Sequence, residues 1–169
     1  MIEDTPEIDF GGVLTLMARS NVECILIGGL AAAVHGSAHV TYDIDLCYRR
    51  PRANLERLVA TLAPYAPYLR GAPPGLPFDW SATTLQRGLN FTLTTSLGPI
   101  DLLGEVPGGG SYEEILPHTE VVSLFGADLR CVTLAMLIRM KRAAGRPKDL
   151  DMLAGLEVLQ DERELRERS

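Results

Sequence analysis

Apolar positions recur along the chain with the periods of both helices and strands. Residues 8–19 carry apolar side chains at near-helical spacing, whereas residues 22–27 form a continuous apolar run typical of a buried strand. A glycine pair at 28–29 ends that run, and residues 30–35 are expected to form a short helix. Residues 43–48 then predict a second strand.

The middle of the chain predicts a helix, an excursion on the surface and a hairpin. Pro51 is well placed to begin a helix that continues to Leu62. Residues 64–80 are rich in proline and glycine and are expected to form an excursion on the surface. Residues 89–95 alternate between apolar and polar side chains, and residues 99–103 follow after a short turn, which favours a hairpin.

The last part of the chain predicts a second hairpin, from 121–124 and 129–132, followed by two helices. Thr133 is expected to cap the first helix and Gly145 to close it. Pro147 is expected to begin the second helix, whose charged end DERELRERS we expect to fray. The elements predict one α/β (α+β) domain, a mixed β-sheet flanked by helices with a helical C-terminal part.

Composition and charge narrow the class of protein. Hydrophobic residues make up 46% of the 169 residues, enough for one buried core. The net charge of -6 argues against broad coating of nucleic acid or of an anionic membrane. No apolar run reaches the ~18 residues of a membrane span, and the acidic start MIEDTPEIDF lacks the pattern of a secretion signal. Cys24, Cys47 and Cys131 have no CxxC spacing and fit reduced thiols, so we expect a cytoplasmic protein with no membrane partner.

Two acids interrupt the predicted second strand. Asp43 and Asp45 stand at alternate positions, so their side chains share one face, about 6.6 Å apart at ~3.3 Å per residue. Close carboxylates repel each other unless a cation lies between them, and Mg²⁺ (or Mn²⁺) prefers oxygen ligands. Asp101 is a third acid in an apolar strand. If the two strands are neighbours, the three acids meet at one edge, which suits metal-assisted displacement at phosphorus.

The glycine pair supplies a second feature. Gly28 and Gly29 lie between a strand and a helix, where backbone N–H groups can receive phosphate oxygens. The order of strand, glycine pair, short helix, Asp-Ile-Asp strand and distant Asp strand is more specific than any of its parts.

This combination resembles the signature of DNA polymerase β-type nucleotidyltransferases. The stretch LAMLIRMKRAAGRPKDLDML (134–153) is similar to small bacterial nucleotidyltransferases related to the AbiEii-type toxins. The resemblance implies a nucleotidyltransferase fold with a catalytic core at about 22–132 and C-terminal helices at about 133–163. It also implies Mg²⁺ dependence and transfer of a nucleoside monophosphate from an NTP to an acceptor hydroxyl.

The resemblance assigns roles to the acids. Asp43 and Asp45 would bind the metal ions, and Asp101 would bind one metal and help to deprotonate the acceptor.

The resemblance also implies a nucleotide-binding set. Gly28 and Gly29 would hold the β- and γ-phosphates, Lys141 would contact the triphosphate, and Asp149 would orient the triphosphate or the lysine. Many members carry a serine directly after the first glycine, whereas here Gly29 follows, so that contact can come only from the backbone.

Simpler interpretations of the same residues stay open. The Asp-Ile-Asp strand can lie at an edge with solvated acids, and the glycine pair can be only a tight turn. Lys141 and Asp149 also suit the dipoles of the two helix ends. His35 and His39 are four apart, but Gly36 lies between them and no third ligand follows, so no zinc site is predicted.

Two classes of function fit the sequence. The first is the nucleotidyltransferase, whose acceptor is an RNA end, a protein hydroxyl or a small molecule such as an aminoglycoside. The toxin-like C-terminal stretch favours RNA or protein, in a toxin–antitoxin or phage-defence system with a cognate partner. The alternative is a non-catalytic nucleotide-binding or partner-binding regulatory module on the same fold. A homodimer fits either class.

Overall fold

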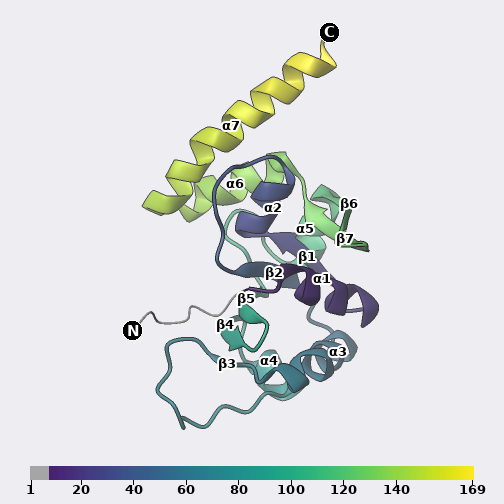
Figure 1. Cartoon of the computed structure of the whole chain (residues 1–169), viewed down its shortest axis with the longest axis vertical. Coiled ribbons are helices and arrows are strands. Elements are labelled where there is room, and N and C mark those ends of the chain that lie inside the picture. The colour runs from purple at the N-terminus through teal and green to yellow at the C-terminus, as the bar shows by residue number, and fades with distance from the viewer. Residues whose placement is uncertain (1–7) are drawn as a thin grey trace.

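A seven-stranded mixed sheet runs through the molecule in the order β3–β4–β5–β2–β1–β7–β6 (Figure 1). The computed structural model describes residues 8–169, so the expectation about the acidic start of the chain falls largely outside the described residues. The strands are β1 (Cys24–Ile27), β2 (Ile44–Tyr48), β3 (Tyr68–Leu69), β4 (Asn90–Thr95), β5 (Gly98–Leu103), β6 (Thr119–Leu124) and β7 (Ala127–Val132). The pairs β2–β5 and β1–β7 are parallel and the others antiparallel.

Helices flank this sheet, which confirms the predicted fold class. They are α1 (Phe10–Arg19), α2 (Gly28–Val34), α3 (Arg52–Leu62), α4 (Ala82–Arg87), α5 (Tyr112–Ile115), α6 (Leu134–Ala144) and α7 (Pro147–Glu167), with short 3₁₀ turns at Ala63–Tyr65 and Leu116–His118. The long helix α7 runs from beside α6 to the C-terminus, away from the sheet (Figure 1). Within residues 8–169, no helix combines the length and the apolar content needed to cross a bilayer.

The central strands are held by apolar side chains on the face opposite the acids. Ile44 pairs with Ile100 and Leu46 with Leu102, and all four side chains are buried. Burial of each such side chain contributes about 1.5–3 kcal/mol, so β2 and β5 form a rigid base for the polar residues between them.

Both predicted hairpins and both C-terminal helices are confirmed. Thr133 caps α6 by accepting a hydrogen bond from the N–H of Met136 at 3.3 Å, and Gly145 ends it with a φ of 64°. The charged end that was expected to fray is helical to Glu167. Arg163 fastens that end by donating to the carbonyl oxygen of His35 at 3.1 Å.

Three features differ from the sequence prediction. The glycine pair is not a loop before a helix but the first turn of α2 itself. The short helices α4 and α5, capped by Ser81 and Ser111, were not predicted. Residues 64–80 were expected to be a surface excursion, and residues 68–69 within them form the edge strand β3.

Candidate metal and nucleotide site

The strand register brings the three predicted acids together. Ile27 pairs with Asp45, Asp45 with Asp101, and Asp101 with Thr92, across four neighbouring strands. Paired residues in neighbouring strands point to the same face, so Asp45 and Asp101 stand side by side. Asp43 lies one residue before β2. Each of the three carboxylates offers an oxygen, and these oxygens lie within 4.8 Å of one another.

The clustered carboxylates perturb each other. Burial, together with the charges of Asp43 and Asp101, raises the pKa of Asp45 to about 8. Burial also raises the pKa of Asp43, with Asp101 adding to the effect and Arg70 opposing it. The protein's own cations therefore leave the cluster short of positive charge. Oxygen donors that carry excess negative charge fit a hard divalent ion such as Mg²⁺ or Mn²⁺.

The glycine pair packs directly against these acids. Gly28 has a φ of +69°, and a Cβ there would overlap Oδ2 of Asp45. A Cβ on Gly29 would lie 2.7 Å from Oγ1 of Thr41, which itself donates to the carbonyl oxygen of Asp43 at 3.1 Å. Glycine is therefore required at 28 both by the backbone and by the space beside the acid.

The two predicted C-terminal residues form an ion pair that a third residue completes. Asp149 is 1% exposed and accepts from Nζ of Lys141 at 3.2 Å and from Nε of Arg146 at 2.6 Å. Burial raises the pKa of Asp149, but the hydrogen bonds from Arg146 and Lys141 outweigh it, so the pKa falls below its ordinary value. The charged carboxylate of Asp149 thus holds the ammonium group of Lys141 in place, and orienting this lysine is one of the two roles predicted for Asp149.

Two cavities adjoin the acids. The first, which we name the Gly29 cavity, has a volume of about 310 Å³, and Gly29, Tyr42 and Lys148 are among the residues that line it alone. The second, the Thr92 cavity, has a volume of about 430 Å³, and Gly28, Asn90 and Thr92 are among the residues that line it alone. The residues that line both are Asp45, Asp101, Lys141, Arg146 and Asp149. Acids and cations are thus shared between two spaces, each large enough for part of a substrate.

Sequence reasoning did not assign Arg70 to the acids. Nη2 of Arg70 lies 2.8 Å from Oδ1 of Asp101, and Nη1 lies 3.9 Å from Oδ2 of Asp43. Arg70 directly follows β3, in the segment that was expected to be a surface excursion. A single arginine after two apolar residues gives no periodic signal, so only the strand pairing places it here.

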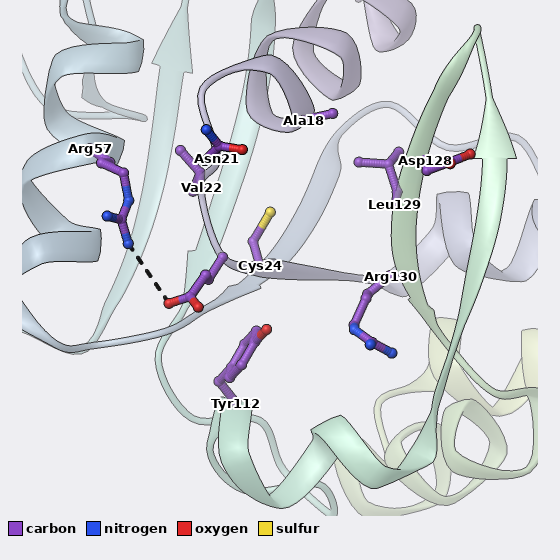
Figure 2. Close-up of a pocket in the computed structure, with 10 residues that line it drawn as sticks. Ala18, Asn21, Val22, Cys24, Arg57, Tyr112, Asp128, Leu129 and Arg130 are labelled. Carbon is purple, nitrogen blue, oxygen red and sulfur yellow. Dashed lines mark ion pairs between the residues drawn. The ribbon is translucent and has the colours of Figure 1, made fainter.

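A third cavity lies at the other end of the sheet, at the start of β1, and is lined by Cys24 among others (Figure 2). It holds about 470 Å³, and Arg57 and Arg130 enter it from opposite sides. Arg57 lies 3.9 Å from Glu23, so part of its charge is compensated. Burial raises the pKa of Cys24 to about 12, which removes the thiolate that a nucleophile needs.

The histidines form no metal site in the described part of the chain, where the three-acid cluster is the one group of potential ligands. Nε2 of His35 is buried, 2.8 Å from the carbonyl oxygen of Val132.

Comparisons with known proteins give a structural similarity only. No family model matches the chain, and no curated protein matches it. Six chains of solved structures are similar to it. One is the solution structure of the antibiotic-resistance factor ANT(2'')-Ia, with 16% sequence identity and a TM-score of 0.48 over 92% of this chain and 89% of that chain.

Proposed function

We propose that the chain is a metal-dependent nucleotidyltransferase that moves a nucleoside monophosphate from an NTP to a hydroxyl acceptor. The observation that carries the proposal is the juxtaposition of three carboxylates with a cationic cluster across two adjoining cavities. Mg²⁺ or Mn²⁺ held by Asp43, Asp45 and Asp101 would neutralise charge that develops on the transferred phosphoryl group.

The reaction is an in-line displacement at the α-phosphorus. A bond forms from the acceptor oxygen to phosphorus, and the bond from phosphorus to the bridging oxygen breaks, so that pyrophosphate leaves with the electron pair. The acceptor proton is proposed to pass to the carboxylate of Asp101, which lines the Thr92 cavity.

The chain's own residues divide the two cavities between the substrates. Lys148 lines the Gly29 cavity but not the Thr92 cavity, and Lys141 lines both. The Gly29 cavity is therefore assigned to the triphosphate, with the N–H group of Gly29 at its edge. Asp149 keeps Lys141 oriented toward it. Attack must come from the side opposite the leaving group, so the acceptor enters through the Thr92 cavity.

The acceptor is proposed to be an RNA end or a protein hydroxyl, in a toxin–antitoxin or phage-defence setting with a cognate partner. The support is the resemblance to AbiEii-type toxins inferred from the sequence of residues 134–153. The net charge of -6 disfavours tight binding along a nucleic acid, so a short end is the expected contact.

The test uses α-labelled NTPs with Mg²⁺ or Mn²⁺, incubated with total RNA and with cell protein. The wild type and the Asp43→Ala/Asp45→Ala double variant run in parallel, and circular dichroism checks that both are folded. Label in RNA or protein with the wild type alone is the expected result. Binding of NTP without any transfer would instead establish the non-catalytic module.

A further inference from the structure

Arg70 extends the row of paired residues that carries the acids. Its backbone N–H donates to the carbonyl oxygen of Thr92 at 3.0 Å, and Thr92 pairs with Asp101. Arg70 therefore stands beside Thr92 on the same face of the sheet as the acids, and its long side chain passes the short Thr92 side chain to reach Asp101.

Arg70 also differs from the other cations of the site in its partner. Lys141 and Arg146 both pair with Asp149. Among residues 8–169, Arg70 is the one cation within ion-pair distance of Asp43 or Asp101. Its guanidinium is therefore the chain's internal substitute for part of the positive charge that the acids require.

The contact of Arg70 is incomplete. Nη2 is shared between Oδ1 of Asp101 at 2.8 Å and the carbonyl oxygen of Leu93 at 2.7 Å. Nε is buried and has no hydrogen-bond partner. A buried donor without a partner costs free energy, so this pairing is less favourable than a fully satisfied guanidinium. It engages one oxygen of Asp101, a carboxylate that is also a potential ligand of a divalent cation.

We propose that Arg70 is a tethered counter-ion that competes with a divalent cation for Asp101 and Asp43, and so sets the metal affinity of the site. The inference rests on the proposed function only in taking the three acids as the metal ligands. A divalent ion must break the hydrogen bond from Arg70 to Asp101 and must approach a positive charge, and both effects weaken its binding.

The test is titration of the metal-free protein with Mn²⁺ alone. Binding is measured by calorimetry and by the loss of the electron paramagnetic resonance signal of free Mn²⁺. Arg70→Met removes the charge, and we expect Mn²⁺ to bind about tenfold more tightly. Arg70→Gln is a second neutral variant that carries the same expectation if the methionine variant does not fold. Arg70→Lys keeps the charge but loses the guanidinium fork, so its Mn²⁺ affinity should lie between those of the wild type and the neutral variants.

The matched control is Arg130→Met, which removes one positive charge at the other end of the sheet (Figure 2). Equal tightening in this control would mean that net charge alone matters, and would overturn the proposal. Unchanged or weaker Mn²⁺ binding in both neutral Arg70 variants would also overturn it. The label-transfer experiment is read separately, so tighter Mn²⁺ binding without any transfer would retain the role of Arg70 and reject the nucleotidyltransferase.

Discussion

The raised pKa of Asp45 predicts that Asp45→Asn stabilises the metal-free protein. Burial beside two other acids moves this pKa from 3.8 to about 8. The folded state therefore holds more protons than the unfolded state between these values, and the free energy of unfolding falls as pH rises through that window. Asparagine has nearly the same shape and does not ionise, so it removes this loss.

The magnitude follows from the size of the shift. A pH of 7 lies about 3 units above the ordinary pKa of Asp45, and each unit is worth ~1.36 kcal/mol. The gain in the free energy of unfolding from Asp45→Asn therefore has an upper value of about 4 kcal/mol. Relaxation and sharing of charge among the three acids reduce this roughly by half, so we expect a gain of about 2 kcal/mol.

The assay is urea denaturation in a chelator at a series of pH values from mildly acidic to mildly alkaline. The difference between Asp45→Asn and the wild type should be small at the acid end and should grow with pH. Addition of Mg²⁺ should stabilise the wild type and leave the variant almost unchanged, because a ligand stabilises only the state that binds it. An equal or lower stability of the variant at every pH would refute this account of the acids.

Three further substitutions probe the site. Gly28→Ala should destabilise the fold by about 1–3 kcal/mol in urea denaturation, because its φ is +69° and a Cβ would overlap an acid, whereas Gly155→Ala, which meets no atom within 4 Å, should not. Lys141→Met should weaken binding of a non-hydrolysable NTP about tenfold in calorimetry, with exposed Arg142→Met as the control that should not. Asp149→Asn should lower the free energy of unfolding by about 2 kcal/mol at neutral pH in the same denaturation assay, and by less in acid. The pKa of Asp149 is lowered in the fold, so its charged form stabilises the fold at pH values above its ordinary pKa, and this stabilisation is lost as the pH falls. Wild-type behaviour of any of the three would contradict the role given to that residue.

The hydrophobic pattern predicted the frame of the site because each part of it is local. The alternate spacing of Asp43 and Asp45 and the apolar flanks of Asp101 required two strands with acids on one face. The caps of α6 and the proline at the start of α7 predicted that Lys141 lies in the last turn of α6 and Asp149 in the first turn of α7.

The remaining parts depend on contacts between distant segments. β3 has two residues, too few to show a period, and its place at the edge comes only from pairing with β4. Arg70 therefore could not be assigned to the acids from sequence. In the same way, Arg146 completes the ion pair of Asp149 through the turn between α6 and α7, a geometry that spacing alone does not specify.

The most direct measurement of the central claim is anomalous diffraction from crystals soaked with Mn²⁺ and a non-hydrolysable NTP. The account predicts an Mn²⁺ peak bound by oxygens of Asp43, Asp45 and Asp101, with the triphosphate beside Lys141 in the Gly29 cavity. Mn²⁺ and nucleotide bound elsewhere, with Asp43 and Asp101 still paired to Arg70, would contradict it.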